Sequence, residues 1–301
     1  MDKSLSKNLA GPLLVGFAAF LWATDALVRY PAIDKVNPTF IVFIEHVLAV
    51  MILLPWILIK HKKRILDLSF KGWLAAFFSG VGGSAFAMVF FTASFLYVNP
   101  SVAILLQKLQ PIMVVVIAYM MLGERPAKKF YFWGIVAVFA GVVLSFPDFD
   151  FSFLNHGFSL HSKGVQYAFA AALLWAASTV AGKLLLERTE PTLAAFWRFF
   201  FGFAALGVMM TMANEQVPWH LMTASTSLYP LLYMSLIPGL LAILVYYAGL
   251  SRTKASVTTF IELIYPIGAV ALNTMFLHTP LNGVQTIAAG VLVLAVAMLS
   301  F

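Results

Sequence analysis

The chain has 301 residues, of which 62% are hydrophobic and only 10% are charged, with a formal net charge of +7 and no cysteine. A soluble domain would carry about a quarter charged residues, so this composition excludes an ordinary soluble protein and indicates a membrane protein. The lack of cysteine excludes a disulfide framework and thiol chemistry.

Ten segments are long and apolar enough to cross a hydrocarbon layer of ~30 Å at ~20 residues each. They lie near residues 11–30, 40–60, 72–97, 100–122, 128–146, 164–186, 191–213, 228–250, 254–277 and 281–301. Lipid offers no partner to a free backbone group, and the residue alternation of a barrel is absent, so each segment is predicted to be a helix. We predict an all-α membrane protein with ten transmembrane helices.

The sequence also repeats itself. Asn37-Pro38-Thr39 and Glu190-Pro191-Thr192 precede similar apolar segments 153 residues apart, and Trp22 and Trp175 match at the same spacing. Each copy holds five predicted helices, and an odd number of crossings reverses orientation. We therefore predict two inverted five-helix repeats, residues 1–150 and 151–301, an arrangement typical of secondary transporters.

The basic residues predict the orientation. With the N-terminus inside, 14 Lys and Arg residues fall in inner loops and 3 on the outer side. The positive-inside rule then places both termini in the cytoplasm of a bacterial-type inner (plasma) membrane. No basic surface is interleaved with aromatic residues, so we expect no nucleic-acid partner, only the lipid bilayer and a small-molecule substrate. We expect a monomer or a homodimer.

Glycine and proline interrupt the predicted helices at matched positions of the two halves. Such interruptions are typical of the binding site of a transporter, because they break the regular helix inside the membrane. The predicted hinge residues are Gly82, Gly83, Pro111, Pro238, Gly239 and Pro266. The alternative is that they reflect only the general abundance of glycine and proline in membrane helices.

Several polar residues fall inside predicted spans, where a charge costs about 2.5–3.5 kcal/mol and should face protein or water. They are Asp25, Glu45, His46, Gln107, Lys108, Gln110, Arg198, Glu262 and Asn273. Depth along the helices predicts two ion pairs, Glu45 with Lys108 and Arg198 with Glu262, or alternatively Glu45 with Arg198. Pairs that only orient helices are the structural alternative. Asp25 and Arg29, at i and i+4, predict a local salt bridge.

Two helix faces are predicted to line a cavity. On the ninth segment the face holds Thr258, Glu262, Tyr265, Pro266 and Asn273, and on the fourth it holds Gln107, Lys108 and Pro111. Trp22 and Trp175 could line the cavity or pack, and His46 could relay protons or hold structure. The candidate substrate-binding or coupling residues are Trp22, Glu45, His46, Gln107, Lys108, Trp175, Arg198, Thr258, Glu262, Tyr265 and Asn273.

No phosphate loop, HExxH motif or nucleophile elbow is present, and the histidine spacing specifies no metal site. We therefore expect neither an enzyme nor a cofactor, and uphill transport would draw on an ion gradient or on exchange. Glu262 lies one turn before Pro266. Movement of Arg198 away from it would change its proton affinity, which is a mechanism for proton coupling.

The stretch from Phe91-Thr92-Ala93 through Gln107-Lys108-Leu109-Gln110-Pro111 to Leu122-Gly123-Glu124-Arg125 resembles the drug/metabolite transporter superfamily, EamA family. Leu21-Trp22-Ala23-Thr24 and Leu174-Trp175-Ala176-Ala177 resemble its Trp-Gly-Ser/Thr element. The chain departs from the pattern at Ala23 and Ala176, where glycine is usual, at His278-Thr279 in place of Gly-Glu, and at Lys108.

The resemblance implies alternating-access transport of small metabolites, commonly export of amino acids. It also implies a cavity lined by helices 1, 3, 4, 6, 8 and 9, with helices 5 and 10 peripheral. Our first hypothesis is an inner-membrane carrier of a small polar or zwitterionic metabolite, an amino-acid exporter. An organic cation, drug or choline-type carrier would need an aromatic cage with one acid and no nearby base. A non-transporting membrane scaffold or lipid-handling protein would show a solid core.

Overall fold

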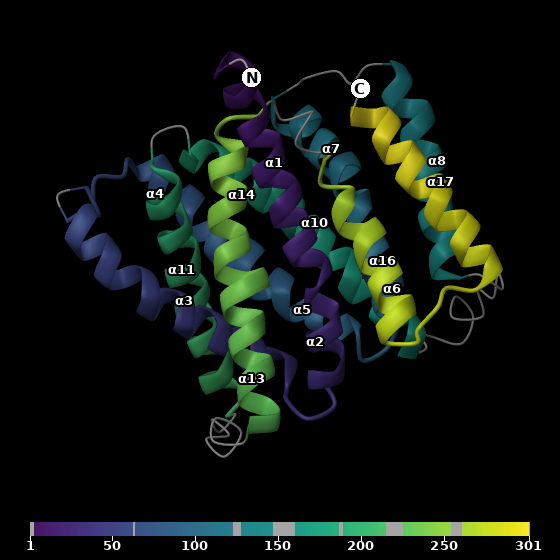
Figure 1. The fold of residues 1–301 in the computed structure, drawn as a ribbon, viewed down its shortest axis with the longest axis horizontal. Coiled ribbons are helices and arrows are strands. Elements are labelled where there is room, and N and C mark those ends of the chain that lie inside the picture. Colours follow the sequence, from purple (N-terminus) through teal and green to yellow (C-terminus); the bar gives the residue numbers. More distant parts are fainter. Residues whose placement is uncertain are drawn as a thin grey trace.

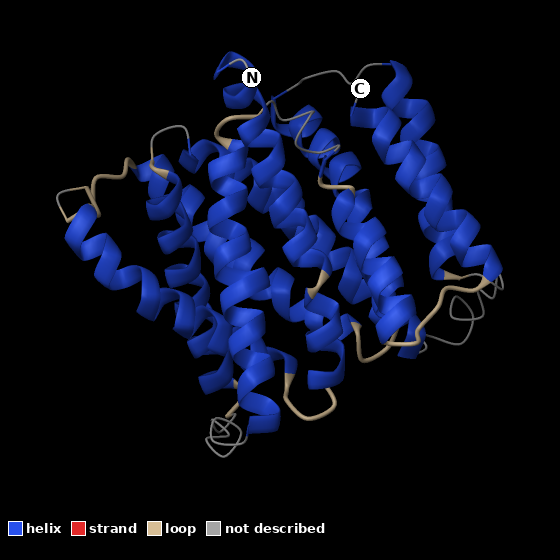
Figure 2. Ribbon diagram, viewed as in Figure 1, coloured by secondary structure: helices blue, strands red, loops and turns tan. Residues whose placement is uncertain are grey.

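The computed structural model describes residues 3–62, 64–122, 128–146, 160–186, 189–214, 225–253 and 261–300. All regular elements in these ranges are helical (Figure 2). Those of the first half are α1 (Lys3–Ala23), α2 (Asp25–Ala32), α3 (Pro38–Lys60), α4 (Phe70–Phe78), η1 (Ser79–Phe86), α5 (Ala87–Ser94), α6 (Pro100–Leu106), η2 (Gln107–Leu109), α7 (Gln110–Leu122) and α8 (Lys128–Ser145). Those of the second half are α10 (Leu160–Leu186), α11 (Pro191–Met212), α13 (Ser225–Met234), η3 (Ser235–Leu241), α14 (Ala242–Leu250), α16 (Ile264–Phe276) and α17 (Gly283–Ser300).

Within the described ranges, eight helices are long and apolar enough to cross a membrane, and two shorter apolar helices accompany them. The eight run over Ala10–Ala32, Pro38–Lys60, Phe70–Ser94, Pro100–Ile117, Lys128–Ser145, Ser162–Leu186, Pro191–Met212 and Thr226–Leu250. The shorter two, Ile264–Phe276 and Gly283–Leu299, stand where the ninth and tenth spans were predicted. The protein is thus a multi-pass membrane protein, and a full set of ten crossings stays a prediction.

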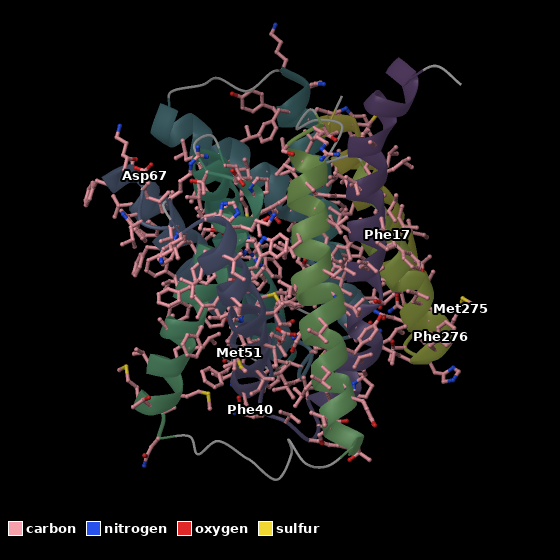
Figure 3. The ribbon with its side chains drawn as sticks, turned by 60° about the vertical axis from the view of Figure 1, so that its left-hand side comes forward. Phe17, Phe40, Met51, Asp67, Met275 and Phe276 are labelled. Carbon is pink, nitrogen blue, oxygen red and sulfur yellow. The ribbon has the colours of Figure 1, made fainter. Side chains whose placement is uncertain are left out.

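The outer surface of the bundle is apolar. Phe17, Met51, Met275 and Phe276 are each at least half exposed and point away from the helices that carry them (Figure 3). A water-soluble monomer rarely exposes apolar patches on this scale. The outer surface of the bundle is therefore suited to contact with the hydrocarbon core of a lipid bilayer.

The two halves of the sequence pack into each other. α1 packs along α14, α3 along α11, α5 along α10, and α8 along α17. The last pair forms one edge of the bundle (Figure 1), as the peripheral helices 5 and 10 were expected to do. The interior of the protein is therefore shared between the halves.

Glycine allows close contact between the packed helices. Gly249 of α14 lies against α1, where a Cβ atom would come within 2.9 Å of Val15 Cγ2 and 3.0 Å of the Gly11 carbonyl oxygen. Small residues at such crossings let membrane helices approach closely and gain van der Waals contact.

Helix irregularities occur at matched positions of the two halves. The π-helical segments η1 and η3 contain Gly82 and Gly83 in the first half, and Pro238 and Gly239 in the second. A 3-10 turn, η2, precedes Pro111 of α7, and a turn at residues 262–263 precedes Pro266 of α16. π-Helices are rare and are often found at functional sites.

The two prolines were expected to kink continuous helices, and they occupy a different position. Pro111 is the second residue of α7, and Pro266 is the third residue of α16. Proline is well tolerated in a first turn, where the missing N–H has no partner in any case. Each proline therefore starts a new helical segment after a short irregular stretch.

A cysteine-labelling experiment tests the orientation. The α3–α4 connection lies at the end of the bundle where α1 begins and α17 ends, and the α2–α3 connection lies at the opposite end (Figure 1). We expect Lys62→Cys to label from the cytoplasm and Asp34→Cys from outside, both being exposed in a chain without cysteine. Labelling of both from one side would contradict the topology.

A second experiment tests the packing of α1 on α14. Gly249→Leu should destabilise the protein by about 1–3 kcal/mol or more, because the new side chain overpacks the contact with Val15. Gly290→Leu is the matched control, since a Cβ atom there meets nothing within 4 Å. Melting temperatures in detergent would compare the two, and equal melting temperatures would refute the close contact.

Candidate functional site

A cavity of about 210 Å³ lies inside the bundle. Its polar lining residues are Asp25, Arg29, Glu45, His46, Ser84, Gln107, Lys108, Gln110, Ser178, Thr179, Arg198 and Glu262. Its aromatic lining residues are Trp22, Phe91, Trp175, Phe199, Tyr246, Tyr247 and Tyr265. Among the described residues, α8 and α17 contribute nothing to this lining.

Most of the candidate residues predicted from the sequence come together here. The cavity is lined by Trp22, Glu45, His46, Gln107, Lys108, Trp175, Arg198, Glu262, Tyr265 and the predicted hinge pair Pro238 and Gly239. Asn273 is not part of the lining, since it is buried and donates to Ser101 Oγ at 3.1 Å. Thr258 lies outside the described residues.

The first polar group at the cavity surrounds Arg29, which is 1% exposed. Its Nε donates to Asp25 Oδ2 at 2.6 Å, its Nη2 to Glu45 Oε1 at 2.5 Å, and its Nη1 to Thr92 Oγ1 at 3.1 Å. One guanidinium therefore ties α2, α3 and α5 together. We call these four residues the Arg29 cluster.

The cluster confirms one predicted pair and corrects another. The i, i+4 salt bridge of Asp25 with Arg29 is present. The predicted pair of Glu45 with Lys108 is wrong, and so is its alternative with Arg198, because Arg29 binds Glu45. The sequence analysis treated Arg29 only as part of a local salt bridge, although Arg29 and Glu45 both fall in the outer halves of their predicted spans.

The second polar group surrounds Arg198 of α11. Its Nε donates to Ser84 Oγ and its Nη2 to the Gly83 carbonyl oxygen, both at 3.3 Å, so it is held by the π-helical segment η1. His46 lies beside it, with Nε2 2.9 Å from Ser84 Oγ and Nδ1 2.7 Å from the Val42 carbonyl oxygen. A carbonyl only accepts, so the Nδ1 atom carries the hydrogen.

The third polar group surrounds Glu262, which accepts a hydrogen bond from the Tyr246 hydroxyl at 2.6 Å. Lys108 interacts with it electrostatically and places its Nζ 5.1 Å from the centre of the Tyr265 ring. The predicted pair of Arg198 with Glu262 is therefore wrong. The two side chains make no ion pair in this conformation, and the proton-coupling mechanism, in which Arg198 moves away from Glu262, stays a prediction.

The two matched tryptophans both line the cavity and pack. Trp22 lies 5.0 Å from the Tyr246 ring and 6.4 Å from the Tyr265 ring, between centroids. Trp175 packs on Phe91 at 5.4 Å, and its Nε1 donates to the Gly83 carbonyl oxygen at 2.8 Å. Cavity lining and packing, which were predicted as alternatives for these two tryptophans, therefore occur together.

The chain is similar to known membrane transporters along most of its length. A model of the EamA-like transporter family matches the chain twice, over residues 9–146 and 162–301. The chain belongs to the EamA-like transporter family. It is thus a membrane transporter of a metabolite-carrying family.

Individual relatives cover most of this transporter. Riboflavin transporter ImpX from Fusobacterium nucleatum subsp. nucleatum (strain ATCC 23726 / VPI 4351) is 28% identical over 302 residues, 98% of this chain and 99% of ImpX. Protein PecM from Dickeya dadantii (strain 3937) is 26% identical over 213 residues, 68% of this chain and 65% of PecM. A chain of known crystal structure shares the fold, with a TM-score of 0.64, 20% identity and 95% of both chains covered.

The lining of this EamA-like transporter is wider than the resemblance implied. Helices 1, 3, 4, 6, 8 and 9 all contribute, and α3 and α11 add Glu45, His46, Arg198 and Phe199. The second and seventh spans thus supply charged groups of the site. The described residues contain no group of His, Asp and Glu that could hold a metal ion.

Removal of Arg29 tests the cluster that it holds. Arg29→Gln should destabilise the transporter by about 3–5 kcal/mol, because it leaves two buried carboxylates without their cation. Arg64→Gln is the control, since that side chain is 73% exposed and its pair with Glu190 should contribute less than about 1 kcal/mol. Thermal unfolding in detergent measures both, and a similar loss in the two variants would contradict the role given to Arg29.

Proposed function

We propose that this protein is a secondary transporter that moves a small, polar aromatic metabolite across the membrane by alternating access. The cavity supports the proposal, because it combines aromatic faces with a few charged and amide groups, as small-molecule sites do. The matched breaks in the two halves, each of which contributes residues to the cavity lining, support the transport cycle. A scaffold or lipid-handling protein would have no need of a polar cavity inside its helices.

Riboflavin is the first substrate to test. A riboflavin transporter is 28% identical along nearly the whole chain. Riboflavin has a planar ring, which suits stacking on Trp22 and Tyr265, and its carbonyl and hydroxyl groups suit Gln107 and Lys108. Gln107 and Tyr265 interact with each other at the cavity, and both side chains can also bind a polar group of a ligand.

An aromatic amino acid is the second candidate, in keeping with an amino-acid exporter. Its carboxylate and ammonium groups need opposite charges within one cavity, and Lys108 and Glu262 supply them. An organic cation, drug or choline-type substrate fits less well. Arg29 binds the acids Asp25 and Glu45, and Lys108 interacts electrostatically with Glu262, which opposes binding of a further cation.

Proton coupling is assigned in our proposal to the Arg29 cluster. Two carboxylates share one guanidinium, so the buried cluster carries one excess negative charge when both are ionised. Uptake of one proton by Glu45 would remove that excess, and separation of α3 from α2 would change how strongly the proton is held. Both termini are proposed to lie in the cytoplasm of a bacterial-type inner membrane, and the protein is proposed to act as a monomer or homodimer.

Transport by purified protein in liposomes tests the substrate. We expect exchange of labelled riboflavin, and Trp22→Leu should lower it about tenfold, because the loss of a stacking face costs on the order of 1–1.5 kcal/mol. Trp56→Leu is the matched control, since Trp56 is 52% exposed on the lipid-facing side of α3. Labelled tryptophan and choline would be run in parallel.

The outcomes separate the candidates. Exchange of tryptophan alone would favour the hypothesis of an aromatic amino-acid transporter, and exchange of choline alone would favour a cation carrier. Absence of transport for all three would reject a polar aromatic substrate. Lys108→Ala and Glu262→Gln should abolish transport and leave folded protein, so normal transport in both would assign these residues to structure.

A further inference from the structure

We propose that Arg198 binds an anionic group, a carboxylate or a phosphate, on the transported molecule. The inference rests on the proposed transport function and specifies the chemistry of its substrate. Arg198 lines the central cavity, is half-buried, and comes from the middle of α11. Its interactions differ from those of the other two cations at the cavity.

Each of the other two cations has an acid as its electrostatic partner. Arg29 binds Asp25 and Glu45 directly, whereas Lys108 interacts with Glu262 electrostatically without a direct ion pair. Arg198 makes no ion pair in the described part of the chain, and its two hydrogen bonds go to the neutral acceptors Ser84 Oγ and Gly83 O. A charge inside the membrane without a counter-charge is costly, so water or a ligand must compensate for it.

The position of Arg198 is fixed by its neighbours. Ser84 Oγ accepts from Arg198 Nε, and its own hydroxyl is left to donate to His46 Nε2. His46 Nδ1 in turn donates to the Val42 carbonyl oxygen. This chain of hydrogen bonds runs from α3 through η1 to α11, so the guanidinium is held before any ligand arrives. His46 is thereby a positioning residue for Arg198.

Three of the five N–H donors of the guanidinium are left for a ligand. Nε and Nη2 bond to the protein, and Nη1 has no acceptor among the described residues. A planar guanidinium suits carboxylate and phosphate oxygens better than an ammonium does. A neutral acceptor could use the same donors, but only an anion also compensates for the charge.

The repeat explains why this cation has no internal partner. At the spacing of 153 residues that relates Trp22 to Trp175, Arg198 takes the place of Glu45. The positions that correspond to Asp25 and Arg29 are occupied by Ser178 and Gly182, which carry no charge. The second half therefore has the charge at position 198 without the counter-charge that the first half provides.

A pair of probes with nearly equal shape and different charge tests the site. Benzoate and benzamide would be titrated against purified wild-type transporter by isothermal titration calorimetry. We expect benzoate to bind at least about tenfold more tightly than benzamide, because hydrogen bonds to charged groups are the stronger ones. Absence of benzoate binding, or equal affinities, overturns the proposal.

Variants assign the preference to one cation. In Arg198→Gln the ratio of the affinity for benzoate to the affinity for benzamide should fall to about one. In Arg198→Lys this ratio should stay above one but below the wild-type value. Lys108→Gln should lower both affinities and keep the ratio. A ratio lost in Lys108→Gln and retained in Arg198→Gln would overturn the proposal. If Arg198→Gln does not fold, Arg198→Lys carries the test, and an unchanged ratio there argues against a guanidinium contact.

Riboflavin carries neither a carboxylate nor a phosphate, so an anion site at Arg198 favours the second candidate, an aromatic amino acid, over riboflavin, and the two experiments can fail separately. A benzoate preference that depends on Arg198, without riboflavin exchange, would keep the anion site and reject the riboflavin assignment. Riboflavin exchange without a benzoate preference would support riboflavin as the substrate and reject the anion site at Arg198.

Discussion

A charge inside a hydrocarbon layer needs a counter-charge, water or a ligand, and this constraint organises the interior of the transporter. Arg29 satisfies it within the protein and in doing so holds α2, α3 and α5 at fixed distances. Lys108 and Glu262 satisfy it together beside Tyr246 and Tyr265. The cavity is the space left between groups that cannot face lipid.

The helix irregularities make this arrangement compatible with an otherwise apolar bundle. A regular helix hides its backbone groups, so it offers a ligand only side chains. The π-helical segment η1 presents the Gly83 carbonyl oxygen to both Trp175 and Arg198. The irregular stretches before Pro111 and Pro266 carry Lys108 and Glu262 to the cavity. Matched glycine and proline residues thus place the polar groups of both halves at one site.

Much of this could be predicted from the sequence, because length and hydropathy define membrane helices and a polar residue in such a helix must face inward. Which charged residues form ion pairs with each other could not be predicted. Position along a helix gives depth, which is one coordinate, while an ion pair also depends on rotation and neighbours, so Glu45 was matched with Lys108 and binds Arg29 instead. Asn273 shares a helical face with Glu262 but lies eleven residues on, about 16 Å at the rise of a helix, where it meets Ser101.

The difference between the halves bears on how the transporter could close around a substrate. In the first half Arg29 joins the acids of α2 and α3, and that end of the cavity is held by charges within the protein. In the second half Gly182 stands where the repeat places Arg29, close to the Tyr247 hydroxyl and to Ser79, and Arg198 faces the cavity. An anion bound to Arg198 would supply the link that Arg29 supplies in the other half. Closure of one side would then depend on the protein alone, and closure of the other side would depend on binding of its cargo.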